Sequence, residues 1–334
     1  MLREPLSPLR TKAIPMKQLP LRLLSGLACA LAMQGAALAE PGFPNKPIEL
    51  VVPYPAGGGT DVLGRAFAQA AAKHLPQTIL VLNKPGASGA IGWADIINGK
   101  PDGYKMVLLA TDLMTQPNMG YTKITYEDFI PIARLNYDPA AITVRADAPW
   151  TSVEEFIAAA RKGDFKIGNG GNGSTWHLAA AAVEDKSGAK FNHIPFAGAQ
   201  PAILSLLGGH LDAITVSAAE TYAHVSAGKL KTLAVMSDTR IKGFEQVPTL
   251  KERGMDISIG TWRGLAVNKQ TPPDVVAVLR TATAKVAKEP ALLEALDKQN
   301  MGYAYAEGEQ FGAVMAKDHA FYNGLIQKLG IKGQ

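Results

Sequence analysis

Cysteine is almost absent from this chain, since Cys29 is the only one among its 334 residues. A single cysteine forms no intramolecular disulfide, so an apolar core has to stabilise the fold without covalent crosslinks. The chain also lacks any run of about 20 apolar residues, the length that spans a membrane. A hydrophobic content of 47% nevertheless supplies enough apolar side chains for a large core.

Signatures of metal and nucleotide binding are missing as well. The six histidines are scattered, with no His-x-x-x-His pair and no cysteine beside them, so we expect no metal site. The glycines at 57–59 are not followed by lysine, which excludes the P-loop pattern, and their spacing is not that of a dinucleotide fingerprint. We therefore expect no cofactor.

Excess positive charge is limited to the first 39 residues. The formal net charge is +5, but these residues hold five basic side chains against one acidic side chain. The rest of the chain is thus close to neutral, at about +1. Because nucleic-acid binding requires a basic face, we expect no nucleic-acid partner.

The first 39 residues also show the order of features of a cleavable export signal. A basic start at Lys17 and Arg22 precedes the apolar residues 23–36, and residues 37–39, Ala-Leu-Ala, have the form of a cleavage site. We predict a signal peptide over residues 1–39, export to the periplasm and a mature chain that begins near residue 40. The sequence leaves open whether translation starts at Met1 or Met16.

After residue 47, short runs of Val, Ile and Leu alternate with longer helical stretches, a pattern typical of βα units and mostly parallel sheets. The first series has predicted strands over 48–52, 78–82 and 105–110, with helices over 62–74 and 87–97. The second series has predicted strands over 141–144, 166–168, 192–196, 213–216 and 232–235. Its predicted helices run over 175–186 and 200–207, and a further helix opens with a capping box at 151–154. The remainder is predicted to be helical over 272–287, 290–299 and 307–329. Two such series favour two lobes, with a ligand cleft beyond the carboxyl ends of their strands.

Four glycine-rich segments, residues 51–61, 83–92, 168–174 and 196–200, fall where a predicted strand passes into a predicted helix. A helix N-terminus presents unpaired N–H groups and the positive end of the helix dipole, so it attracts an anion. One such segment alone is equally compatible with a tight turn whose glycines serve geometry only. Four of them favour a shared anion site built from backbone N–H groups and small hydroxyls, for which no arginine clamp is required. In the first segment we expect Gly58→Val to abolish binding, because the loop needs unusual backbone angles or close approach of the ligand.

Ser174 and His177 lie three residues apart at the start of a predicted helix, a spacing that permits a nucleophile and its base. The Gly-x-Ser-x-Gly elbow is absent and no acidic partner for His177 can be singled out. The other interpretation is that Ser174 caps the helix and His177 hydrogen-bonds a neighbouring loop. We expect no enzymatic activity, and a periplasmic hydrolase that uses this pair stays open as the alternative.

Three acidic or aromatic positions have two interpretations each. Asp61 either caps a helix or anchors ligand water. Glu220, after a predicted strand that ends near Ser217, is either an acceptor for a ligand hydroxyl or amine or a solvated surface carboxylate. Trp262 either packs at a hinge or walls the pocket, and the neighbouring Arg263 would add charge there.

On these motifs the chain resembles the TctC or Bug family of periplasmic solute receptors, the substrate-binding component of tripartite tricarboxylate transporters. The matching segments run in order over essentially the whole mature chain and include residues 54–61, 83–89, 171–177, 193–198, 201–210 and 262–265. The resemblance implies an α/β, two-lobed type II periplasmic-binding-protein fold with a ligand cleft between the lobes. It further implies a receptor that closes on a small carboxylate and delivers it to a membrane permease. We expect a monomer, although the sequence does not determine the oligomeric state.

The resemblance also implies that backbone and small hydroxyl groups of both lobes hold one ligand carboxylate. We expect lobe 1 to comprise residues 40–140 and 263–334, and lobe 2 to comprise residues 141–262. The ligand-binding candidates in lobe 1 are Tyr54, Pro55, Ala56, Gly57, Gly58, Gly59, Thr60, Asp61, Ala87, Ser88, Thr111 and Asp112. Those in lobe 2 are Gly171, Asn172, Gly173, Ser174, His177, Ala197, Gly198, Ser217 and Glu220.

One departure from the family pattern leaves the ligand unassigned. Many relatives carry an acidic residue near the strand end where this chain reads Ala-Ile-Thr-Val-Ser-Ala over 213–218. A di- or tricarboxylate, an amino acid and an aromatic acid all stay open as ligands. A sensor protein also stays open as the partner in place of a permease.

Overall fold

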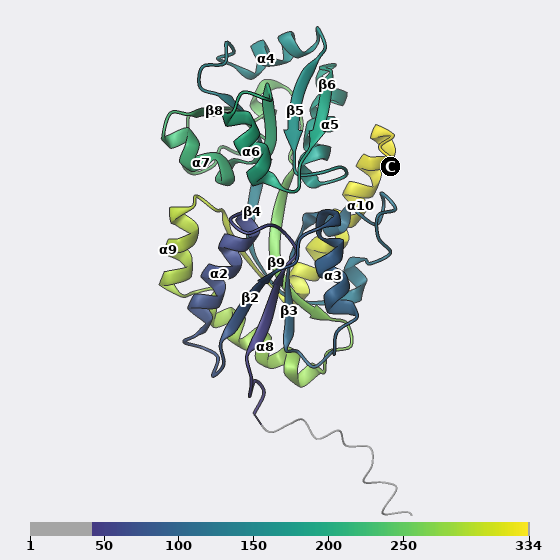
Figure 1. Cartoon of the computed structure of the whole chain (residues 1–334), viewed down its shortest axis with the longest axis vertical. Coiled ribbons are helices and arrows are strands. Elements are labelled where there is room, and N and C mark those ends of the chain that lie inside the picture. Colours follow the sequence, from purple (N-terminus) through teal and green to yellow (C-terminus); the bar gives the residue numbers. More distant parts are fainter. Residues whose placement is uncertain (1–41, 333–334) are drawn as a thin grey trace, which may run out of the picture. The chain divides into compact units, whose positions relative to one another are not determined.

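The computed structural model describes residues 42–332 (Figure 1). The predicted signal peptide lies outside these residues. None of the helices in this part of the chain is long and apolar enough to cross a membrane.

The first part of the sheet is built from β1 (Ile48–Val52), β2 (Ile79–Asn83), β3 (Lys105–Ala110) and β9 (Gly260–Asn268). The strands β2, β1 and β3 lie parallel in that order, and β9 runs antiparallel to β3. Buried Val, Ile and Leu side chains fill β1 and β3, as expected for strands covered on both faces.

The longest strand, β4 (Phe129–Arg145), joins this part of the sheet to the next. Over 129–139 it pairs with β9, and over 133–136 it also pairs with β10 (Tyr303–Glu307). Over 140–145 it pairs instead with β7 (Ala213–Ser217) and β8 (Leu230–Val235). Figure 1 shows β4 and β9 side by side between the two groups of elements. A change of partners within one strand thus connects the two parts of the sheet.

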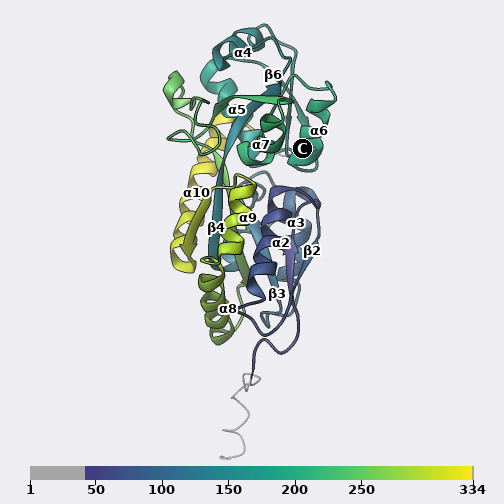
Figure 2. The same ribbon diagram turned by 90° about the vertical axis from the view of Figure 1, so that its left-hand side faces the viewer.

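The second part of the sheet continues from β7 to β5 (Phe165–Asn169) and β6 (Phe191–Pro195), all parallel to one another. Its helices are α4 (Val153–Ala160), α5 (Thr175–Ser187), α6 (Ala199–Leu207) and α7 (Ala218–Ser226). The first part carries α2 (Gly59–Ala71), α3 (Ala90–Ile97), α8 (Pro273–Val286), α9 (Pro290–Lys298) and α10 (Gly308–Leu329). Short 3-10 turns lie at Ala87–Gly89, Thr111–Met114, Tyr126–Asp128 and Lys251–Arg253. The helix α2 packs against α8 and α9 (Figures 1 and 2).

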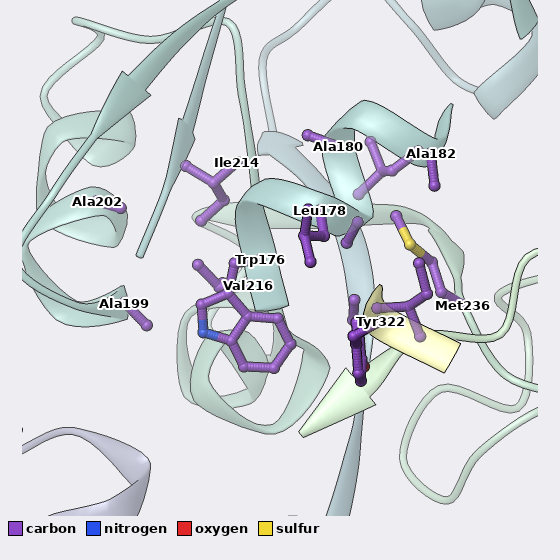
Figure 3. Packing of buried hydrophobic residues seen from close by; sticks show 14 of the residues in the cluster. Trp176, Leu178, Ala180, Ala182, Ala199, Ala202, Ile214, Val216, Met236 and Tyr322 are labelled. Carbon is purple, nitrogen blue, oxygen red and sulfur yellow. The ribbon is translucent and has the colours of Figure 1, made fainter. Parts of the chain in front are cut away.

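Helix α5 lies inside the apolar core, and its small side chains are buried on most of its faces. Trp176 and Leu178 of α5 lie close to Ile214 and Val216 of β7, and Tyr322 of α10 reaches the same interior (Figure 3). The Tyr322 hydroxyl donates to the carbonyl of Gly260 at 3.1 Å, which satisfies its polar end. Close packing here fixes the start of α5, which is the end of this helix that lies nearest the candidate functional site.

Most predicted elements are present within a few residues of their expected bounds, but four predictions were wrong. The strand predicted over 141–144 is the end of the 17-residue β4, and the region after 272 contains β10 as well as helices. The sheets are mixed, because β4 and β9 run antiparallel to their neighbours. The helix cap is shifted by one residue from the predicted capping box: Ser152 is the N-cap and accepts from the Glu155 N–H at 3.2 Å, while the Glu155 carboxylate accepts from the N–H of the preceding Thr151 at 2.7 Å.

Candidate functional site

A small cavity opens where loops from both parts of the sheet meet. Its volume is about 50 Å³, which suits a small solute. Three of its walls come from strand-to-helix loops, and the others from the ends of β3, α7 and β9. The lining residues are Tyr54, Pro55, Gly58, Gly59, Thr60, Ala110, Asp112, Gly170, Trp176, Ala197, Gly198, Ala199, Gln200, Pro201, Glu220, Thr261 and Arg263.

A larger cleft of about 1120 Å³ lies beside Tyr137, Trp262 and the helices α9 and α10. It contains none of the residues that the sequence marks as ligand-binding candidates. The smaller cavity contains nine of them, namely Tyr54, Pro55, Gly58, Gly59, Thr60, Asp112, Ala197, Gly198 and Glu220. We therefore take the smaller cavity as the candidate site.

All four glycine-rich segments lie between a strand and a helix, as predicted: β1 to α2, β2 to α3, β5 to α5 and β6 to α6. Three of them line the cavity. The second, with Ala87 and Ser88, is not among the lining residues within 42–332. Instead, Ser88 lies against the third segment, because a Cβ added at Gly171 would stand 3.1 Å from the Ser88 hydroxyl.

Two helices begin at the cavity with a glycine in the capping position. Gly58 precedes α2 and Gly198 precedes α6, and neither N-terminus has a side-chain cap among the described residues. The first-turn N–H groups of a helix have no partner inside the helix. Gly198 has φ 119°, a conformation that side chains rarely adopt, so glycine is required at the mouth of α6.

Asp61 of α2 does not line the cavity but holds the first loop in shape. Its carboxylate accepts from the Gly57 N–H at 2.9 Å, from Asn83 at 2.9 Å and from Arg65 Nε at 3.0 Å. Burial alone would raise the pKa of Asp61, but the hydrogen bonds from Arg65, Gly57 and Asn83 outweigh it and lower the pKa below its ordinary value. Of its two interpretations, the structure supports a local role at the start of α2.

Asp112, just after β3, connects the two parts of the sheet. Its Oδ1 accepts from the N–H and hydroxyl of Thr175, the first residue of α5, at 2.8 and 3.1 Å. Its Oδ2 accepts from the Tyr54 hydroxyl at 3.0 Å. Burial raises the pKa of Asp112 despite these donors, and burial together with the charge of Asp112 raises the pKa of Tyr54 well above 10. Tyr54 therefore remains a hydrogen-bond donor to Asp112.

Arg263 of β9 forms the charged wall of the cavity. Its Nε donates to the Thr60 hydroxyl at 2.9 Å and its Nη1 donates to Asp138. Asp138 also accepts from Asn136 Nδ2 at 2.8 Å and from the Gly302 N–H at 3.0 Å. The guanidinium side chain is only 3% exposed, so its geometry is held by buried partners.

Glu220 of α7 lies beside Arg263 in the wall of the cavity. Its Oε1 accepts from the Gly59 N–H at 2.9 Å, while its Oε2 lies 3.9 Å from Arg263 Nη2. The side chain is 6% exposed, so the interpretation of Glu220 as a solvated surface carboxylate was wrong. Burial raises the pKa of Glu220, although the charge of Arg263 and the Gly59 N–H oppose that rise.

Ser174 and His177 are not arranged as a nucleophile and base. The Ser174 hydroxyl caps α5 by accepting from the His177 N–H at 3.2 Å, and His177 Nδ1 accepts from the Gly173 N–H at 3.0 Å. Burial and the neighbouring His193 lower the pKa of His177 to about 4, which makes its ring a poor base at neutral pH. The geometry fits a helix cap and a ring tied to the loop before it.

Several other candidates lie beside the cavity rather than in its wall. Thr111 is buried, and its hydroxyl accepts from the Trp262 N–H at 3.0 Å. Ser217 caps α7 by accepting from the Glu220 N–H at 3.2 Å. The carbonyl of Asn172 accepts from Gln116 at 3.4 Å, and Gly173 packs on Met119. Among the residues that the structure describes, the lining also excludes Ala56, Gly57, Asp61, Ser174 and His177.

The loop contains the unusual backbone angle that we expected, but at Gly57 and not at Gly58. The φ and ψ of Gly58 are −75° and 166°, which any residue adopts, and a Cβ there would meet only Pro55 and Glu220 at ordinary distances of 3.5 and 3.9 Å. The constraint falls on its neighbours instead. Gly57 has φ 81°, and a Cβ at Gly59 would stand 2.6 Å from Arg263 Nη2.

The list of ligand-binding candidates omits eight lining residues, of which Arg263 matters most, although the sequence indicated Arg263 as a charge beside Trp262. A buried guanidinium lies in the cavity although the loop argument required none. The sequence signal for this buried arginine was its place between apolar residues in the segment 260–268, which forms a fully buried strand in the structure. The other seven are Ala110, Gly170, Trp176, Ala199, Gln200, Pro201 and Thr261.

No group of three or more His, Cys, Asp or Glu side chains in residues 42–332 is arranged to hold a metal ion. The fold and the cavity together are those of a solute-binding protein, with a small site where the ends of two sets of strands meet. The chain belongs to the tripartite tricarboxylate transporter family receptors, TctC, whose family model matches residues 63–331.

Relatives in this family cover nearly the full chain. A Cupriavidus necator protein described as the UPF0065 protein in the gbd 5′ region is 35% identical over 324 residues, 92% of this chain and 96% of that protein. A ligand-free crystal structure of a TctC solute binding protein from Polaromonas is 80% identical and covers 86% of this chain and 100% of that one, with a TM-score of 0.68. The structure of the periplasmic binding protein BugD is 28% identical and covers 87% of this chain and 100% of that one, with a TM-score of 0.82.

Two further solved structures show the same fold at 23% identity. One, from R. palustris, contains adipate, covers 88% of this chain and 100% of that one and has a TM-score of 0.82. The other, MatC from Rhodopseudomonas palustris, contains malate, covers 85% and 100% and has a TM-score of 0.78. These neighbours establish a two-lobed α/β periplasmic-binding-protein fold for this chain. The family is one of receptors rather than enzymes.

Proposed function

We propose that this protein is a periplasmic receptor that binds a small carboxylate in the cavity beside α6 and delivers it to the permease of a tripartite tricarboxylate transporter. In this proposal lobe 1 comprises residues 40–140 and 263–334, and lobe 2 comprises residues 141–262. The change of partners within β4 at Ala140 supports the first of these boundaries. Residues 1–39 are proposed to direct export, and the receptor is proposed to act as a monomer.

The observation that carries the ligand class is the N-terminus of α6. Its first turn, from Ala199 to Pro201, lines the cavity and contains no acidic residue, and Gly198 before it provides no side-chain cap within the described chain. The positive end of the helix dipole and unpaired N–H groups therefore face the cavity. A ligand carboxylate there would form charge-assisted hydrogen bonds in a site screened from water.

Arg263 adds a second source of positive potential. Its Nη1 and Nε are held by Asp138 and Thr60, but its Nη2 lies on the cavity side, close to Gly59. The acid opposite α5, Asp112, is already bound by three donors from Thr175 and Tyr54. The carboxylate of a ligand is thus best placed at α6 and Arg263, away from Asp112. The adipate and malate in the two solved structures belong to those proteins, and their 23% identity with this chain supports the fold alone.

Isothermal titration calorimetry on the purified protein tests the ligand class. The panel contains mono-, di- and tricarboxylates, amino acids and aromatic acids, each paired with its primary amide or methyl ester. We expect at least one free acid to bind and its amide to bind at least tenfold more weakly, because the amide lacks the charge that the helix dipole attracts. Binding of sugars, amides or simple cations together with no binding of any carboxylate would exclude the proposed ligand class.

A further inference from the structure

One buried oxygen beside the cavity has no hydrogen-bond partner. Glu220 Oε2 accepts from no donor among the described residues, although its side chain is only 6% exposed. The nearest cation, Arg263 Nη2, lies 3.9 Å away, which is beyond hydrogen-bond distance. A buried carboxylate oxygen without a donor is costly, so such atoms in native proteins usually have a bound partner.

The other acidic side chains around the cavity are satisfied. Asp112 has three donors, from Tyr54 and Thr175. Asp138 is bound on Oδ1 by the Gly302 N–H and on Oδ2 by Asn136 and Arg263. Glu220 itself has one satisfied oxygen, since Oε1 accepts from the Gly59 N–H at 2.9 Å. The unsatisfied position is therefore a single atom, Glu220 Oε2.

The charges around the cavity also favour a cationic group at this atom. Two carboxylates, those of Asp112 and Glu220, line the cavity together with a single guanidinium, that of Arg263. Asp138 already engages Arg263 directly. A protonated amine next to Glu220 would supply both the missing donor and a second positive charge.

We propose that the ligand is an amino carboxylate whose ammonium group donates to Glu220 Oε2 while its carboxylate lies at the N-terminus of α6. This inference rests on the proposed function, since it adds a second contact to the same ligand. Glu220 is then a specificity-determining residue that separates amino acids from hydroxy acids and from plain carboxylic acids.

Matched triplets of ligands test the inference. Each triplet has one carbon skeleton that carries an amine, a hydroxyl or a hydrogen next to the carboxylate: alanine, lactate and propionate; aspartate, malate and succinate; glutamate, 2-hydroxyglutarate and glutarate; phenylalanine, phenyllactate and phenylpropionate. In every triplet that binds, we expect the amino member to have at least a tenfold lower Kd than the other two. Equal or tighter binding of the hydroxyl or hydrogen member would overturn the inference and leave the carboxylate proposal intact.

Glu220→Gln tests the role of this residue directly. Glutamine keeps an oxygen that accepts from the Gly59 N–H, so the contact between α7 and α2 is preserved. Its NH₂ group replaces Oε2, and we expect the preference for the amino member to fall below threefold while the hydrogen member binds as before. A preference that stays tenfold in this variant would show that Glu220 does not bind the amine.

Glu289→Gln is the matched control. Glu289 pairs with Lys73 and His74 and is not among the cavity-lining residues of the described chain, so the same chemical change there should leave the tenfold preference in place. If other carboxylates in the calorimetric panel bind but no amino member does, the inference fails while the proposed function stands. If no carboxylate binds at all, the proposed function fails as well.

Discussion

Four of the described helices begin beside the cavity, and they begin in two different ways. At α5 and α7 a serine, Ser174 or Ser217, caps the first turn, and a carboxylate lies next to it. Asp112 accepts from the N–H of Thr175 at the start of α5, and Glu220 lies in the first turn of α7 itself. The protein has thus neutralised the positive ends of these two helices with its own side chains.

The helices α2 and α6 are preceded by glycine and have no side-chain cap in residues 42–332. The start of α2 is partly occupied, because the Gly59 N–H donates to Glu220 and Asp61 holds the preceding loop. The start of α6 has neither an acid nor a cap in the described chain. The comparison supports the proposal that the serine-led starts serve the fold and that the glycine-led start of α6 binds the carboxylate of the ligand.

The most damaging change to this arrangement is Gly198→Val. A β-branched side chain disfavours φ 119°, and since a Cβ there meets Pro55 only at an ordinary 3.6 Å, the cost lies in the backbone conformation. We expect the Kd of the tightest carboxylate to rise by at least about 100-fold, equivalent to about 2.7 kcal/mol, as measured by calorimetry. Gly188→Ala is the control, since Gly188 also has positive φ but lies at the end of α5 in open space. Equal losses in the two variants would contradict a special role for the start of α6.

A second pair of variants compares two neighbouring glycines of the first loop. Gly59→Ala places a Cβ 2.6 Å from Arg263 Nη2, whereas Gly58→Ala meets only ordinary contacts. We expect about a 30-fold weaker Kd for Gly59→Ala, or about 2 kcal/mol, and a change below threefold for Gly58→Ala. A larger loss at Gly58 than at Gly59 would mean that the loop approaches the ligand differently from the geometry described here.

The serine-led start of α5 should make stability depend on pH. The pKa of His177 is lowered from 6.5 to about 4 by burial and by His193, so between these values the unfolded chain binds a proton that the folded chain does not. The contribution of His177 to the free energy of unfolding is therefore complete above pH 6.5 and is lost as the pH falls toward 4. Allowing for the partial exposure of the ring, we expect a loss of about 2 kcal/mol. Denaturant unfolding from pH 7 to pH 4 measures it, and His177→Asn should flatten that part of the profile. An unchanged slope in the variant would assign the pH dependence to other groups.

The smallest effects are expected at the serine caps themselves. Ser174→Ala and Ser217→Ala each remove one capping hydrogen bond of 3.2 Å, so the free energy of unfolding should fall by about 1 kcal/mol. The affinity for the carboxylate should change by less than threefold. A tenfold loss of affinity without a loss of stability would place a serine hydroxyl on the ligand and erase the distinction between the two kinds of helix start.

Much of this arrangement could be predicted from local sequence. The strands over 48–52 and 105–110 and the helix that begins at Thr175 follow from apolar runs and from a serine followed by a helical stretch. The four glycine-rich segments mark strand-to-helix turns because glycine permits backbone angles that other residues avoid. Seven of the nine candidates that line the cavity lie in these segments, and the other two are Asp112 and Glu220.

The rest depends on contacts between distant residues. The strand β9 reads Gly-Thr-Trp-Arg-Gly-Leu-Ala-Val-Asn, and its polar start and two glycines obscure a strand that burial between β3 and β4 stabilises. The burial of Glu220 follows from a hydrogen bond with Gly59, 161 residues away. The pairing of Arg263 with Asp138 spans 125 residues. The sequence suggested Asp112, Glu220 and Arg263 as charged groups, but no local pattern contains these separations, so their burial and pairing could not be derived from it.

A crystal structure with the carboxylate of lowest Kd tests the central claim most directly. We predict that one carboxylate of the ligand lies at the first turn of α6, with an oxygen about 2.7–2.9 Å from a backbone N–H of Ala199 or Gln200. A carboxylate bound elsewhere, with water or a neutral group of the ligand at the start of α6, would contradict the account.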